Sequence, residues 1–77
     1  MNIYVVKTLV EGGIDKNSCS VELFKDFKAA SDYANEEIDR YADDYNGNVV
    51  ERAYVYFSMQ SGDVNVTIEI ENHEIEL

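Results

Sequence analysis

The chain has 77 residues, no proline, a single cysteine, and an apolar fraction of 45%. Sixteen acidic residues against six basic ones give a formal net charge of −10. This length predicts one domain over residues 1–77, and a domain of this size buries only about 60% of the surface of its unfolded chain. The charge argues against direct contact with nucleic acid or an anionic membrane, because the phosphates of either would repel it.

The negative charge is unevenly distributed along the chain. Residues 1–28 hold four lysines and four acidic residues, which cancel. Residues 29–77 hold twelve acidic residues against only Arg40 and Arg52, and so carry the whole net charge. A basic partner is therefore favoured.

The cysteine content and the N-terminal residues bear on location. Cys19 stands alone, so neither an internal disulfide nor a cysteine metal cluster is expected. A lone thiol suits a reducing compartment, and residues 1–7 lack the basic and long apolar regions of an export signal. No run approaches the roughly 18–20 apolar residues of a membrane span. We therefore expect a cytoplasmic protein in which Cys19 is a small, half-buried strand residue.

Two strands are predicted before the first helix, at residues 2–10 and 19–24. The first is rich in β-branched residues and ends at Gly12-Gly13, after which a polar loop is expected. The second alternates between two faces, since strand side chains point to opposite sides in turn. One face would carry Cys19, Val21 and Leu23, and the other Ser20, Glu22 and Phe24.

A helix is predicted over residues 27–45, because apolar side chains recur there at intervals of three and four. They belong to Phe27, Ala30, Ala34, Ile38, Tyr41 and Tyr45. Asp26 occupies the N-cap position, where its carboxylate can accept free backbone N–H groups. Asn46 or Gly47 suits the left-handed conformation of a C-cap.

Two further strands, at residues 49–59 and 64–71, are predicted after the helix, with a turn over residues 60–63. Val64, Val66, Ile68 and Ile70 alternate with polar residues, as in a strand with one buried face. Residues 72–77 are interpreted as a bulged extension or a frayed tail. The expected fold class is α+β, in the order ββαββ, with one long helix packed on one face of a four-stranded, mainly antiparallel sheet. The pattern leaves the strand order open.

The residue pattern gives little support for catalysis or metal binding. His73 is the only histidine, and a dyad with Cys19 would lack a third, orienting group. Residues 43–48 have the wrong spacing for a calcium loop, because a glycine at loop position six would put Ala42 at position one. A loosely held surface cation is the alternative left open there. The sequence otherwise predicts a non-catalytic protein with no cofactor and no bound metal.

Acidic residues line one side of the predicted helix at spacings of four, three and four. They are Asp32, Glu36, Asp39 and Asp43, and Glu37 and Asp44 widen the patch. Like charges at these spacings each cost roughly 0.2–0.5 kcal/mol. Such a cost without evident compensation points to function, although a merely solubilising surface is the alternative.

The functional interpretation is that these carboxylates stand in for phosphates before a basic, nucleic-acid-binding surface of a partner protein. The four span about 16 Å, or one charge per ~4–5 Å, whereas duplex DNA carries one per ~1.7 Å. The helix alone is therefore too dilute a mimic. A second acidic run at strand spacing would have to join it, formed by Glu69, Glu71, Glu74 and Glu76.

Tyrosines suggest a second surface. If Ala53, Val55 and Phe57 face the helix, Tyr54 and Tyr56 lie on the other face of the sheet. Tyr4 joins them in one of the two orientations that the first strand leaves open, since Lys7 marks the odd face of that strand as partly solvated. Exposed patches of this kind commonly mark an interface. Three interpretations stay open: a homodimer formed through this face or an edge strand, a foreign partner, or tyrosines that are simply solvated.

Part of the chain resembles small ββαββ proteins of bacteria and phages. The resemblance rests on Tyr4-Val5-Val6 followed by Leu23-Phe24-(x)5-Ala30-(x)2-Tyr33-Ala34. Size and acidity also resemble phage-encoded inhibitors of host defence, including anti-CRISPR proteins, some of which mimic DNA. This resemblance implies an inhibitor that acts in the host cytoplasm, and it assigns no site residues. The alternative is a small self-associating structural or regulatory module.

Overall fold

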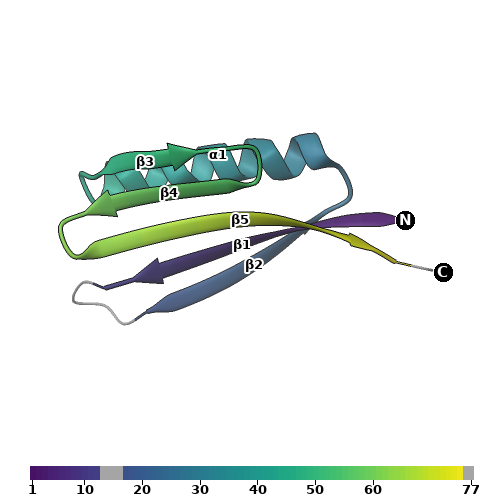
Figure 1. Cartoon of the computed structure of the whole chain (residues 1–77), viewed down its shortest axis with the longest axis horizontal. Coiled ribbons are helices and arrows are strands. Elements are labelled where there is room, and N and C mark those ends of the chain that lie inside the picture. Colours follow the sequence, from purple (N-terminus) through teal and green to yellow (C-terminus); the bar gives the residue numbers. More distant parts are fainter. Residues whose placement is uncertain (13–16, 76–77) are drawn as a thin grey trace.

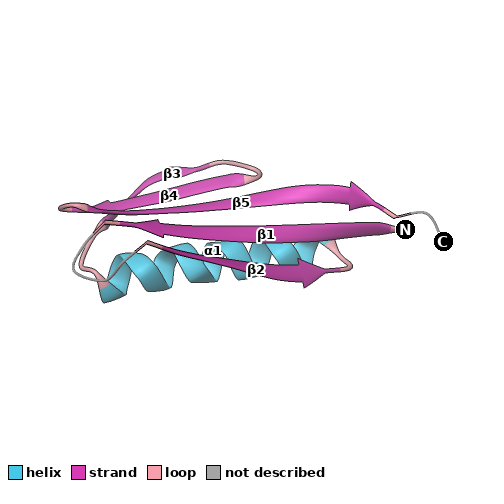
Figure 2. Ribbon diagram, turned by 90° about the horizontal axis from the view of Figure 1, so that it is seen from below, coloured by secondary structure: helices cyan, strands magenta, loops and turns pink. Residues whose placement is uncertain are grey.

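The computed structural model describes residues 1–12 and 17–75 (Figure 1). These residues form one helix, α1 (Phe27–Asp44), which lies along one face of a five-stranded antiparallel sheet (Figure 2). The strands are β1 (Asn2–Glu11), β2 (Ser18–Phe24), β3 (Asn48–Arg52), β4 (Tyr56–Ser61) and β5 (Val64–Glu74). Their order across the sheet is β2-β1-β5-β4-β3, so the first and last long strands pair at its centre.

The core lies between α1 and the three central strands. The helix contributes Ala30, Ala34 and Ile38, all fully buried. The sheet contributes Val6, Val10, Phe57, Met59, Val64, Val66, Ile68 and Ile70. The predicted helical stripe and the predicted alternation of the last strand are thereby confirmed, except that Tyr45 follows the end of the helix and is exposed.

The sheet has five strands, and the expectation of four is wrong. The expected strand at residues 49–59 is broken by a tight hairpin whose tip is Tyr54-Val55. The Ala53 amide donates a hydrogen bond of 2.8 Å to the Tyr56 carbonyl oxygen and closes this turn. Two-residue hairpin loops favour glycine, asparagine and aspartate. Because none of these occurs here, the regular alternation of residues concealed the turn.

The other predicted elements hold, with small shifts at their ends. The helix ends one residue earlier than expected, and its C-terminal turn is followed by Asn46 in the left-handed region, at φ 53°. Asp26 occupies the N-cap position with an extended backbone, but its carboxylate accepts no capping hydrogen bond, contrary to the expectation. β5 continues to Glu74 instead of fraying after residue 71, because it pairs with β1 as far as Asn2.

Parts of two expected irregular segments cannot be compared with the structure. Residues 13–16 of the expected loop and residues 76–77 of the expected tail lie outside the described residues.

The turn expected over residues 60–63 is confirmed as the two-residue hairpin loop that joins β4 to β5, in which Gly62 adopts a positive φ of 58°.

The helix leaves much of β2 uncovered. Every residue of this strand is exposed except Phe24, whose ring lies 5.2 Å from that of Tyr33 on α1. Cys19 is exposed as well, not half-buried as expected, because it lies on the sheet face turned away from the helix. β2 is therefore held in place mainly by its pairing with β1.

We expect Gly12→Ala to destabilise the fold far more than Gly62→Ala. Both glycines have a positive φ, which costs a residue with a Cβ about 1–2 kcal/mol. A Cβ at Gly12 would also collide with the backbone carbonyl oxygen of Asp63, whereas one at Gly62 meets no atom within 4 Å. In urea unfolding, the loss in free energy of unfolding should be about 2 kcal/mol larger for Gly12→Ala than for Gly62→Ala. Equal losses would contradict this packing of β1 against the turn before β5.

Candidate functional site

Four exposed carboxylates run along the outward side of α1, opposite the buried alanines. We call Asp32, Glu36, Asp39 and Asp43 the acidic ridge. All four are exposed, and their spacing along one side of the helix is the one expected from the sequence. The ridge therefore belongs to the part of the helix that the core does not use.

Two of the four ridge carboxylates are paired with basic side chains. Lys28 Nζ lies 2.9 Å from Asp32 Oδ2. Arg52 reaches across from β3, with one guanidinium nitrogen 2.5 Å from Asp39 Oδ1 and another 2.6 Å from Asn35 Oδ1. The expectation of uncompensated repulsion is therefore wrong for Asp32 and Asp39. Arg52 was not recognised as a partner because it lies 13 residues from Asp39 in the chain.

The two carboxylates expected to widen the patch are also engaged. Arg40 Nε lies 2.7 Å from Glu37 Oε2, and its Nη1 lies 3.1 Å from Asp44 Oδ2. Glu37 is largely covered and sits beside Tyr33. Burial, followed by the negative charge of Glu37, raises the pKa of Tyr33 to about 12. Arg40 thus offsets one of the two negative charges on this flank of the ridge.

The ridge keeps a negative charge after these pairs are counted. Glu36 and Asp43 form no ion pair with any residue that the structure describes. The six carboxylates of α1 face three basic partners, Lys28, Arg40 and Arg52, which leaves three negative charges. The helix surface therefore retains a net attraction for a basic molecule.

Glu69 and Glu71 of the second acidic run do not reinforce the ridge. Glu69 and Glu71 point to the sheet face opposite α1, since they alternate with the buried residues of β5. Glu71 lies 2.8 Å from Lys7 Nζ and 2.9 Å from His73 Nε2. The hydrogen bond from Lys7, and then that from His73, lowers the pKa of Glu71. The expected joint surface is therefore wrong for Glu69 and Glu71, because the sheet separates them from the ridge.

The other two acids of that run are Glu74 and Glu76. Glu74 is exposed at the end of β5, where it pairs with Asn2 of β1. Glu76 falls outside the described residues.

The three tyrosines expected on one sheet face lie on two. Tyr56 precedes the buried Phe57 and points away from the helix. Tyr4 and Tyr54 instead meet Phe27 at the start of α1, with ring centroids 5.5 Å and 4.7 Å from that of Phe27. The turn at the tip of the β3–β4 hairpin brings Tyr54 over to the helix side.

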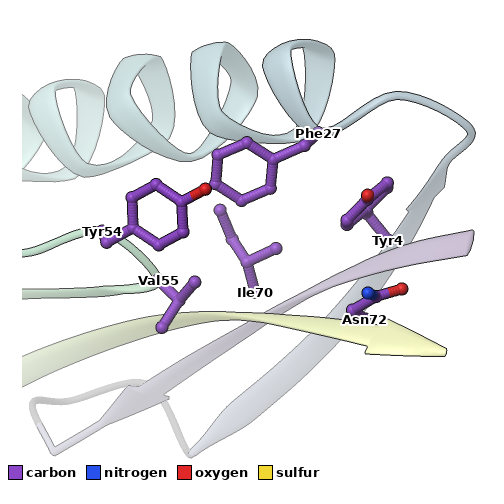
Figure 3. Close-up of a pocket in the computed structure, with 6 residues that line it drawn as sticks. All are labelled: Tyr4, Phe27, Tyr54, Val55, Ile70 and Asn72. Carbon is purple, nitrogen blue, oxygen red and sulfur yellow. The ribbon is translucent and has the colours of Figure 1, made fainter.

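These aromatic rings line a hollow at the N-terminal end of the helix (Figure 3). Its volume is about 240 Å³, and its lining consists of Tyr4, Phe27, Tyr54, Val55, Ile70 and Asn72. Small-molecule sites usually occupy about 300–1,000 Å³, so this hollow suits a single inserted side chain better than a substrate. The sequence offered no signal for it, because the aromatic residues come from three separate elements.

The described residues do not bring the candidate catalytic pair together. Cys19 pairs with Leu9, and His73 pairs with Ile3. The two side chains are therefore six positions apart along β1, or about 20 Å.

Across residues 1–12 and 17–75, no group of three or more His, Cys, Asp and Glu side chains is placed to hold a metal ion. Within the same residues, no helix is long and apolar enough to cross a membrane.

Arg52→Met should test whether this arginine holds β3 against the helix. We expect the free energy of unfolding to fall by about 1 kcal/mol at low salt, and by less at high salt, because the lost contacts are partly exposed. Lys28→Met is the matched control, since it removes a single, largely exposed ion pair within the helix and should lower the free energy of unfolding by less. Equal losses in urea unfolding would contradict a bridging role for Arg52.

The chain matches no protein-family model, and neither the curated proteins nor the solved structures contain a significant match to it. The functional argument therefore rests on the geometry of the surface.

Proposed function

We propose that this chain is a non-catalytic interaction protein that binds a basic surface of a partner protein through the acidic ridge. One observation carries the proposal: the exposed side of α1 keeps a negative charge after its ion pairs are counted, while the opposite side of the helix is buried in the core. Glu36 and Asp43, which have no described ion-pair partner, supply the charge that is free to meet a partner.

The ridge is ordered by its own contacts before any partner arrives. Lys28 and Arg52 restrain the carboxylates of Asp32 and Asp39. A restrained side chain loses less entropy on binding, which favours affinity. The pairs at the ridge also limit its attraction, because a partner must compete with Lys28 and Arg52 for these oxygens.

The charge density of the ridge favours one class of partner. Ridge charges recur about every 5 Å along the helix, whereas a single strand of B-DNA carries one charge per about 3.4 Å. Glu69 and Glu71 of the second acidic run lie on the other sheet face and cannot raise this density. We therefore propose partial occupation of a basic groove, of the kind that holds nucleic acid, and not imitation of a whole duplex.

An inhibitor of bacterial defence, of the anti-CRISPR kind, is one biological setting for such a contact. Its support is the resemblance in size and acidity, together with the net charge of −10. An inhibitor of this type would act in the cytoplasm of the host cell.

The test compares Glu36→Lys/Asp43→Lys with wild type in capture from bacterial lysate. Both residues are exposed and unpaired among the described residues, so their reversal should leave the fold intact. We expect basic nucleic-acid-handling proteins to be retained by the wild type, displaced by added duplex DNA, and reduced at least about tenfold with the variant. Mass spectrometry quantifies the captured proteins.

Glu11→Lys/Glu74→Lys is the control with the same change in net charge. Both residues are exposed at strand ends, away from the ridge. It should capture the same proteins as the wild type. Equal loss of capture in both variants would mean that binding depends on net charge and not on the ridge. Unchanged capture by Glu36→Lys/Asp43→Lys would exclude the ridge from the contact.

A further inference from the structure

The two edges of the sheet differ in how well they are protected. β3 is short, contains a bulge between Val49 and Glu51, and ends with the charged pair Glu51-Arg52. β2 has seven residues, pairs regularly with β1 over its whole length, and carries one charge, Glu22. Natural sheets normally blunt their edges with charges, prolines, bulges or short strands. Only β3 follows that rule, so β2 presents an open row of backbone donors and acceptors.

The exposed side chains of β2 are apolar on the sheet face turned away from α1. Val21 and Leu23 are 52% and 64% exposed, and Cys19 precedes them on the same face. On β1, Leu9 is opposite Cys19 and is itself 38% exposed. This edge therefore combines unpaired backbone with apolar side chains, which is the composition of an interface and not of a solvated rim.

The charge distribution allows two copies of the chain to meet at this edge. Residues 1–28, which include β1 and β2, contain equal numbers of basic and acidic residues, while the net charge of −10 lies in the rest of the chain. Two copies approaching through β2 would therefore bring their neutral segments together and keep their acidic segments apart. The short β3 edge, by contrast, belongs to the acidic part of the chain.

We propose that two copies of this chain associate by antiparallel pairing of their β2 strands about a two-fold axis at Val21. In this register Val21 is opposite its own copy, and Cys19 is opposite Leu23 of the second copy. The open face thus gains three apolar cross-strand pairs, each of a kind that stabilises a sheet. On the other face Glu22 is opposite Ser20 of the second copy, so no like charges are directly opposed.

The two-fold axis is perpendicular to the sheet, because directly opposed residues of neighbouring strands point to the same face. The pair of chains forms one continuous ten-stranded sheet, with five strands from each copy. Both α1 helices lie on the same face of it. The acidic ridges stay exposed on that face, so association through β2 and binding through the ridge do not compete.

The first test is sedimentation equilibrium of the wild type, Val21→Lys and Val50→Lys. Lysine at Val21 sets two positive charges directly opposite each other, and we expect the dissociation constant to rise at least about tenfold. Val50 is 64% exposed on the β3 edge, so Val50→Lys makes a matched change and should leave the dimer intact. A wild type that stays monomeric up to millimolar concentration would overturn the proposal, as would a dimer weakened only by Val50→Lys.

The second test probes the register with disulfides in a Cys19→Ser background. Val21→Cys places two thiols directly opposite each other, within the distance that a disulfide spans. Leu23→Cys, the control, places them four positions apart along the strands, or about 13 Å, which no disulfide bridges. Under mild oxidation we expect covalent dimer from the first variant and little from the second. Equal yields, or a higher yield from Leu23→Cys, would refute the register.

Neither experiment depends on the partner proposed for the ridge. Failure of the β2 pairing would leave the binding proposal standing, because α1 and its carboxylates take no part in the strand contact. Failure of the capture experiment would likewise leave the dimer untouched.

Discussion

The packing of one helix against five strands is the constraint on which this structure depends. α1 has 18 residues and a narrow buried stripe of two alanines and one isoleucine. The small alanines allow close approach to the sheet, and the large core side chains come mainly from β1, β4 and β5. A single helix cannot cover a sheet of this width. One whole sheet face and the outer strand β2 are consequently left to solvent or to a partner.

The charges are arranged around the same constraint. Basic side chains are few, and three of them, Lys28, Arg40 and Arg52, lie beside carboxylates of α1. Arg52 does more than neutralise, since it connects the β3 edge with the side of the helix. Lys7 and Glu71 form a similar pair across the open sheet face. The result is an acidic helical layer on one side and a nearly neutral β1–β2 edge on the other, so the two proposed contacts would use separate parts of the molecule.

Periodicity alone predicted the elements that bury one regular stripe. The helix, β1 and the alternation of β5 were evident from spacing, because each keeps a single face in the core along most of its length. β2 was predicted from its alternation of side chains, although only Phe24 of this strand is partly buried. The break between β3 and β4 was not, since Tyr54-Val55 carries no turn residue and the alternation continues through it. Strand order was also beyond reach, because the pairing of β1 with β5 joins residues at opposite ends of the chain.

The candidate sites were predictable only in part, for a related reason. The ridge lies on one helix and follows from spacing. Its ion pair with Arg52, the separation of Glu69 and Glu71 from it, and the division of the tyrosines between two faces all depend on contacts between elements. The open edge at β2 could not be predicted, because the sequence left the strand order undetermined and any of the predicted strands could have been at an edge.

The central claim is that α1 leaves the β2 edge uncovered and that two copies of the chain pair through it. Hydrogen exchange of backbone amides at several protein concentrations tests this claim most directly. Amides of β2 that point away from β1 should exchange freely in dilute protein and become protected as the concentration rises, whereas β3 should exchange at the same rate throughout. Protection of β2 that does not change with concentration, or a rise in protection confined to β3, would contradict the account.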